Sequence, residues 1–193
     1  MDYTHFNQRV NKITSLNTQK LAPFLYNLVR AYEPETVIEV GSFAGYTTAW
    51  LAKGLQDNGF GTLYAIDNYT LETSASVLHN NLASLDVAQE VIIIDGDSKQ
   101  VQWPSDCQLA FLDGNHSLEY VEYEFAKCDE LGALCIVLHD TTDWWGSREF
   151  KCPQGWTYIE YPWMGGFRIY TRKIKLPKEY HYTQEKAPKG YIE

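Results

Sequence analysis

Short apolar runs alternate with helix-like patterns along most of the chain. The runs that predict strands are TVIEVGSFAG at 36–45, where the strand leads into a glycine turn, TLYAID at 62–67, EVIIIDG at 90–96, LAFLDG at 109–114 and ALCIVLHD at 133–140. Segments between them, such as 71–85 and 117–131, carry apolar residues at helical spacing. Strands separated by helices predict βαβ units and a parallel sheet. The runs are continuous rather than alternating, which is typical of strands covered on both faces.

The two ends of this pattern differ from its middle. Residues 21–29 place their apolar side chains on one helical face, and Asn17 or Thr18 is in position to cap that helix. Near the other end, the strand-like runs at 156–162 and 165–173 are separated by a short turn. They predict a closing antiparallel hairpin.

The turn after the first predicted strand is the most informative stretch. Glu39 stands where the apolar run stops, and Gly41 and Gly45 frame a turn tight enough to require glycine. This is how a Rossmann-like domain begins a nucleoside-binding site, although a purely structural strand-to-helix turn has the same pattern. A dinucleotide-binding turn usually reads G-x-G-x-x-G, and the G-S-F-A-G of this chain has no middle glycine. An NAD-dependent oxidoreductase is therefore disfavoured, because a pyrophosphate needs backbone amides at close range.

Composition narrows the class of protein. The chain has 193 residues and a net charge of −9, which argues against a nucleic-acid partner because phosphate binding depends on Lys and Arg. The scattered cysteines Cys107, Cys128, Cys135 and Cys152 form no C-x-x-C pair and are expected to be reduced. No apolar stretch is long enough to cross a membrane, and no leader pattern is present. We expect a soluble cytoplasmic protein with one domain over residues 1–193.

The basic residues concentrate at the C-terminal end. Residues 168–193 contain seven Lys and Arg against three Glu, and the last part has little apolar periodicity. We expect a core at 17–173 and a basic extension at 174–193, either solvated or docked on a neighbouring subunit.

Asp113 and Asp140 each follow a predicted strand and each has a histidine nearby, in D-G-N-H and H-D-T. One helix separates the two strands, so both carboxylates are expected at the same edge of the sheet, where ligands bind in open α/β folds. With His139 they form a candidate metal site that suits Mg²⁺ or, through imidazole, a transition metal. The alternative is that Asp113 only contacts a cofactor and that His139 and Asp140 form a hydrogen-bonded strand end.

Five parallel strands that end in polar residues, followed by a hairpin, resemble the class I S-adenosylmethionine-dependent methyltransferases over residues 17–173. The resemblance implies a Rossmann-like three-layer α/β sandwich with a mostly parallel seven-stranded sheet. It implies that Asp67 accepts the ribose hydroxyls, that Asp97 and Ser98 form the adenine turn, and that Glu39 faces the methionine end. The cofactor-binding residues that the resemblance implies are Glu39, Gly41, Ser42, Gly45, Asp67, Asp97, Ser98 and Asp113. As an alternative, Asp67 caps the helix that follows it.

The motifs D-G-x-H-S and H-D-T resemble a branch of small O-methyltransferases that includes macrolide-sugar, cephalosporin-biosynthesis and catechol-type enzymes. That resemblance implies that Asp113 and Asp140 hold a divalent cation, most simply Mg²⁺, and that His116 is the general base. Asn115 and Thr141 depart from the branch, where Asp and Asn are common. His139 either ligates the metal or orients Asp140.

The resulting hypothesis is metal-assisted methylation of a small-molecule or carbohydrate hydroxyl. Trp144, Trp145, Trp163 and Met164 are candidates for acceptor stacking, or alternatively for core packing or a homo-oligomer contact. A second hypothesis is a degenerate domain that binds the cofactor without turnover, favoured by Asn115 and Thr141.

Overall fold

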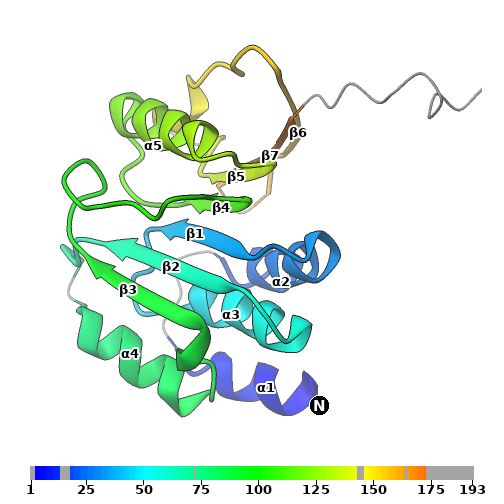
Figure 1. Ribbon diagram of the computed structural model, residues 1–193, viewed down its shortest axis with the longest axis vertical. Helices are drawn as coiled ribbons and strands as arrows, with labels where there is room; N and C mark the ends of the chain where they lie inside the picture. The colour runs from blue at the N-terminus through cyan, green and yellow to red at the C-terminus, as the bar shows by residue number, and fades with distance from the viewer. Residues whose placement is uncertain (1–2, 14–17, 72, 143–145, 164, 173–193) are drawn as a thin grey trace, which may run out of the picture.

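The computed structural model describes residues 3–13, 18–71, 73–142, 146–163 and 165–172. They form a seven-stranded sheet in the order β3-β2-β1-β4-β5-β7-β6 (Figure 1). The strands are β1 (Thr36–Val40), β2 (Thr62–Asp67), β3 (Val91–Asp95), β4 (Leu109–Leu112), β5 (Cys135–His139), β6 (Trp156–Tyr161) and β7 (Phe167–Arg172). The α-helices are α1 (Tyr3–Val10), α2 (Leu21–Tyr32), α3 (Tyr46–Asn58), α4 (Ala75–Ser84) and α5 (Leu118–Glu130). Two 3₁₀ turns are η1 (Ala88–Glu90) and η2 (Gly146–Arg148).

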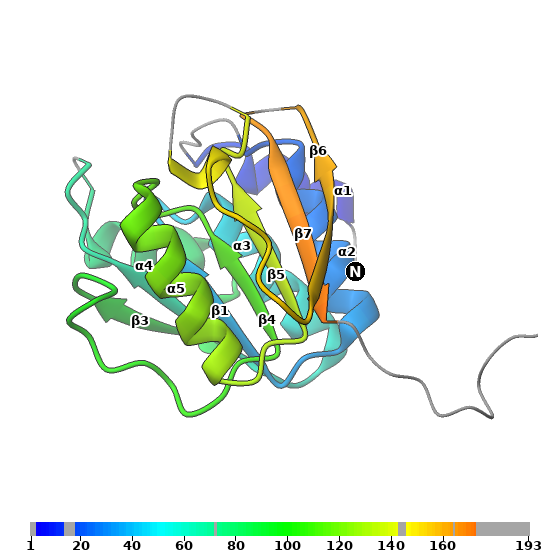
Figure 2. The ribbon, with the colours of Figure 1, turned by 90° about the horizontal axis from the view of Figure 1, so that it is seen from above.

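The sheet confirms the predicted topology. Strands β1 to β5 pair in parallel, whereas β7 pairs antiparallel with both β5 and β6. The strand order reverses between β1 and β4, so the carboxyl ends of these two strands border a crevice. Both predicted hairpin runs form strands, and the hairpin closes the sheet beside β5 (Figure 2).

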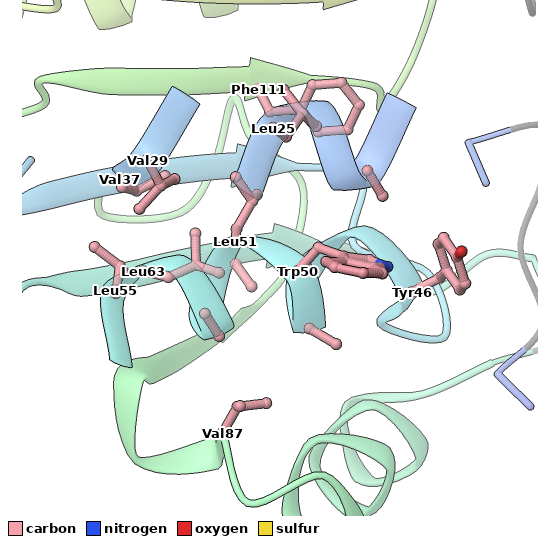
Figure 3. Close-up of a cluster of buried hydrophobic side chains, with 14 of the residues drawn as sticks. Leu25, Val29, Val37, Tyr46, Trp50, Leu51, Leu55, Leu63, Val87 and Phe111 are labelled. Carbon is pink, nitrogen blue, oxygen red and sulfur yellow. The ribbon is translucent and has the colours of Figure 1, made fainter. Parts of the chain in front are cut away.

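Helices α2 and α3 cover one face of the sheet, and the largest apolar cluster lies beneath them (Figure 3). Trp50 is fully buried there and meets the Phe6 ring edge-on at a centroid distance of 5.2 Å. This contact packs α1 against α3. The sequence pattern did not predict α1, because its eight residues carry few apolar side chains.

Helix α5 packs on the opposite face, where Phe125 meets the rings of Phe150, Trp156 and Tyr170 at centroid distances of 4.9–5.2 Å. The layers are thus helix, sheet and helix. Coverage of β3 is thinner than its continuous apolar run predicted, and Ile92 is 47% exposed. Edge position explains this difference, since β3 has a neighbouring strand on one side only.

Neither candidate for the cap of α2 directly precedes the helix. The residue that precedes this helix is Lys20, and its side chain makes no capping hydrogen bond. Thr18 instead accepts the Ala22 amide through its backbone carbonyl, and Asn17 lies outside the described residues. Cys107, Cys128 and Cys135 are free thiols and are buried, as expected. Within the described ranges, no helix is both long and apolar enough to cross a membrane.

Candidate functional site

A cavity of about 490 Å³ lies at the carboxyl ends of the parallel strands. This volume falls within the roughly 300–1,000 Å³ typical of small-molecule and cofactor sites. Most of the predicted site residues line it, namely Gly41, Ser42, Asp67, Asp97, Ser98, Asp113, His116 and Asp140. Glu39, Gly45 and His139 do not line it. The arrangement brings the predicted cofactor, base and metal residues to one cavity or directly behind its wall.

The glycine turn is shaped by contact with the neighbouring strand end. Gly41 has φ +91°, and a Cβ atom there would lie 2.2 Å from the Asp113 carbonyl oxygen. Gly45 has φ +94°, and its Cβ would meet Leu78 of α4 at 2.5 Å. Both glycines therefore allow close packing of the turn against other parts of the protein. The turn in consequence holds the Asp113 backbone at the cavity rim.

Asp67 fixes the same turn from the other side. One of its carboxylate oxygens accepts the Phe43 amide at 2.7 Å, and the other accepts the Tyr69 amide at 2.7 Å. Ser74, rather than Asp67, caps the following helix. The alternative role of Asp67 as a helix cap is thus wrong. Each oxygen keeps a second lone pair for a ligand.

Glu39 lies behind the cavity wall, not in it. It is fully buried, and neither carboxylate oxygen has a partner with hydrogen-bond geometry among the described residues. Burial raises its pKa to about 8; the Thr48 hydroxyl opposes that rise, and the Asp113 and Asp67 carboxylates add to it. Glu39 is thus poised to be uncharged at neutral pH.

At the β3 end of the cavity, helix α5 contributes two residues that the sequence analysis missed. Tyr120 donates to Asp97 at 2.6 Å, and Ser98 donates to Glu124 at 2.6 Å. The Tyr120 hydrogen bond lowers the pKa of Asp97, while burial raises the pKa of Glu124 to about 7. The i, i+4 spacing on α5 was the available signal, because it places both side chains on one helical face.

The metal candidates gather at the other end. Ligand atoms of Asp113, His139 and Asp140 all lie within 4.8 Å of one another. His139 Nδ1 lies 2.7 Å from Asp113 Oδ1 and 3.5 Å from Asp140 Oδ1. The histidine therefore lies closer to the Asp113 carboxylate than to that of Asp140. His116 Nε2 lies 3.1 Å from Asp140 Oδ2 and 3.9 Å from Asp113 Oδ1.

Ser147, in η2, joins the two loops that carry this cluster. Its hydroxyl donates to the Asp140 carbonyl at 2.6 Å, and its amide donates to the His116 carbonyl at 3.1 Å. The Arg168 guanidinium of β7 in turn donates to the carbonyls of Ser147, Arg148 and Phe150. No sequence pattern indicated this role, because it depends on tertiary contacts alone. Asp140 itself has φ +55°, a strained backbone held by its surroundings.

The residues proposed for acceptor stacking are only partly described. Trp144, Trp145 and Met164 lie outside the described residues, as does the basic extension at 174–193. Trp163 is 61% exposed and meets Tyr161 edge-on at a centroid distance of 5.4 Å. It is an exposed aromatic at the hairpin turn and does not line the cavity, so its role in acceptor binding stays a prediction.

The fold of this chain is similar to those of several solved methyltransferases. The O-methyltransferase TomG of Streptomyces achromogenes, involved in tomaymycin synthesis and solved with SAM, has a TM-score of 0.63 and 20% identity over 88% of each chain. An O-methyltransferase of Bacillus cereus in complex with SAH has a TM-score of 0.66 and 16% identity, covering 88% of this chain and 91% of its own. A Geobacter sulfurreducens methyltransferase has a TM-score of 0.63 and 14% identity over 88% of each chain. No protein of curated function matches the chain.

A match to a protein-family model identifies the family of this chain. Residues 38–141, more than half of the chain, match the model described as a methyltransferase domain. The matched range runs from β1 through Thr141 and so includes the glycine turn, Asp67, the β3 turn and the Asp113–Asp140 cluster. The chain belongs to this methyltransferase-domain family.

Proposed function

We propose that the protein transfers a methyl group from S-adenosylmethionine to a hydroxyl of a small molecule or carbohydrate, with the help of a divalent cation. The observation that carries this proposal is the single cavity that joins the glycine turn and Asp67 to the Asp113, His116 and Asp140 cluster. A methyl donor and a deprotonated acceptor must meet in line within one site.

The cavity fits the cofactor in size and in chemistry. Its wall offers carboxylate oxygens of Asp67 to a ribose diol and the polar β3 turn, with Asp97 and Ser98, to a purine. S-Adenosylmethionine supplies a methyl group that is already activated on a sulfonium. The relatives solved with SAM or SAH support this choice of cofactor.

The cluster also fits a hard divalent cation. Asp113 and Asp140 provide carboxylate oxygens, and the His139 imidazole holds the Asp113 carboxylate from behind the cavity wall. These residues would hold Mg²⁺. When bound, such a cation lowers the pKa of a coordinated hydroxyl and so makes it a better nucleophile.

In this mechanism His116 takes the acceptor proton. Its imidazole lies at the cavity wall, and its Nε2 is within hydrogen-bond reach of Asp140. The acceptor oxygen forms a bond to the methyl carbon as the carbon–sulfur bond breaks, and the electron pair stays on sulfur. S-Adenosylhomocysteine and the methyl ether leave, and the proton on His116 passes to solvent.

The test is a methyl-transfer assay over a panel of sugars, catechols and hydroxy acids, with radiolabelled cofactor. His116→Ala should lower the rate by roughly 10²- to 10⁴-fold, the usual span for a positioned general base. Asp140→Asn or chelation should abolish turnover, while S-adenosylhomocysteine affinity stays close to that of the wild type. Full activity after exhaustive chelation would remove the cation from the proposal.

A second candidate is a domain that binds the cofactor without turnover. Asn115 and Thr141 favour it, because they depart from the related O-methyltransferases. Cofactor binding with no methyl transfer to any acceptor would support this candidate.

A further inference from the structure

The purine end of the cavity contains a buried carboxyl group to which the sequence motifs assign no role. Glu124 is 2% exposed, yet it contributes to the cavity wall together with Gly96, Asp97, Ser98 and Tyr120. It projects from α5, whereas Asp97 and Ser98 belong to the turn that follows β3. Two elements far apart in sequence therefore build this end of the cavity.

The contacts of Glu124 leave one oxygen for a ligand. Oε1 accepts the Ser98 hydroxyl at 2.6 Å, and no hydrogen bond to Oε2 occurs among the described residues. Ser98 is held from the other side, because its carbonyl accepts the Trp103 indole N–H at 2.7 Å. Both Ser98 and Glu124 are thus fixed before any ligand binds.

Asp97 and Glu124, which both line this wall, have pKa values shifted in opposite directions. Asp97 accepts hydrogen bonds from the Tyr120 hydroxyl and the Lys99 amide, which lower its pKa and keep it ionised. Glu124 has the opposite tendency, because burial and the Asp97 charge raise its pKa, and the Ser98 hydrogen bond and the Lys99 ammonium oppose this only in part. Below a pH of about 7, one wall therefore presents both an acceptor carboxylate and a neutral carboxyl group.

Adenine needs this combination of partners. Its exocyclic amine donates hydrogen bonds, while its N1 accepts one. A 6-oxo purine reverses both groups, since its O6 accepts and its N1–H donates. We propose that Glu124 is a specificity-determining residue of the purine subsite, which holds the Ser98 hydroxyl through Oε1 and presents a neutral carboxyl donor to the purine ring of the cofactor. This inference rests on the proposed function.

Calorimetry with S-adenosylhomocysteine tests the proposal without an acceptor. Between pH 6 and 8.5, wild-type affinity should fall at least threefold more than that of Glu124→Gln, because only the wild type loses the carboxyl proton. The other groups that could titrate, namely the ligand amine and the side chains of Asp97, Lys99, Tyr120 and His116, are the same for both proteins. The difference between the two pH profiles therefore isolates Glu124. At pH 6.5 the amide donor should keep the affinity of Glu124→Gln within about threefold of the wild type.

Ligand selectivity gives an independent measurement. At pH 6.5 the wild type should prefer S-adenosylhomocysteine to S-inosylhomocysteine by at least tenfold, and Glu124→Ala should lose most of this preference. The preference of the wild type should also shrink as the pH rises, since an ionised Glu124 can accept the N1–H of the 6-oxo purine. Should Glu124→Ala fail to fold in a thermal melt, the comparison with Glu124→Gln decides alone.

Two results would overturn the inference: the same pH profile in wild type and Glu124→Gln, or full selectivity in a folded Glu124→Ala. Failure of the cofactor assignment on which the proposed function rests looks different, because the wild type would then bind neither ligand. Failure of methyl transfer alone would leave these binding measurements unchanged.

Discussion

Replacing Gly41 by Ala should destabilise the protein for two separable reasons. The first is backbone strain, because Gly41 has φ +91°, a region in which an L-residue costs about 1–2 kcal/mol. The second is a steric clash, since the new Cβ would lie 2.2 Å from the Asp113 carbonyl oxygen and 2.7 Å from the Gly114 amide nitrogen. Both are backbone atoms, so no side-chain rotation relieves the clash. Overpacking of this kind costs about 1–3 kcal/mol.

Gly59→Ala is the matched control. Gly59 has φ +82° at the end of α3, and no heavy atom lies within 4 Å of its ideal Cβ position. It therefore carries the backbone strain without the clash. We expect a loss of about 1–2 kcal/mol for Gly59→Ala and about 2–5 kcal/mol for Gly41→Ala. For a chain of this size, each kcal/mol corresponds to a decrease in Tm of roughly 2–4 °C.

Chemical and thermal unfolding, followed by circular dichroism, measure both variants. The clash also moves the Asp113 backbone, so Gly41→Ala should weaken S-adenosylhomocysteine binding while Gly59→Ala leaves it unchanged. Equal stability of the two variants would refute the close approach of the glycine turn to Asp113.

Two further predictions concern residues around the cavity. Ser147→Ala removes the hydrogen bond that positions the Asp140 carbonyl. In a spectroscopic titration it should lower the affinity for Mn²⁺ roughly 10- to 100-fold, and Ser147→Thr should partly restore that affinity. Unchanged Mn²⁺ affinity in Ser147→Ala would contradict a positioning role for Ser147. Burial raises the pKa of Glu39 from 4.5 to about 8, so the folded protein retains this proton where the unfolded chain has lost it. Wild-type stability relative to Glu39→Gln should therefore fall by roughly 3–4 kcal/mol as the pH rises from 5 to 8. Parallel pH–stability curves from urea unfolding would show that Glu39 is not the group responsible.

Much of the fold could be predicted from the sequence because strand order follows from pattern. Continuous apolar runs separated by helical segments led to the parallel strands, and the last two runs led to the hairpin. Exposure of Ile92 was not predicted, since a periodic pattern does not say which strand lies at an edge. Helix α1 was missed because its stabilising contact, Phe6 on Trp50, is tertiary.

The candidate site likewise contains residues that the sequence could predict and residues that it could not. Asp67 ends a strand, and Asp113 and Asp140 each directly follow one, so their convergence follows from topology. Glu124 and Ser147 could not be predicted in this way, because each acts through a tertiary contact. Glu124 contacts Ser98, and Ser147 contacts the loop that carries Asp140. Glu39 was expected to face the cofactor; it is fully buried and does not line the cavity, and its role toward the cofactor stays a prediction.

Cofactor binding by calorimetry tests the central claim most directly. S-Adenosylhomocysteine should bind one to one, and at about 100 times its Kd it should stabilise the fold by roughly 2.7 kcal/mol, a Tm increase of about 5–11 °C. Asp67→Ala should weaken the binding, because the carboxylate that lines the cavity is lost. NAD should bind neither protein. Binding of NAD by the wild type, with no binding of S-adenosylhomocysteine, would contradict the account.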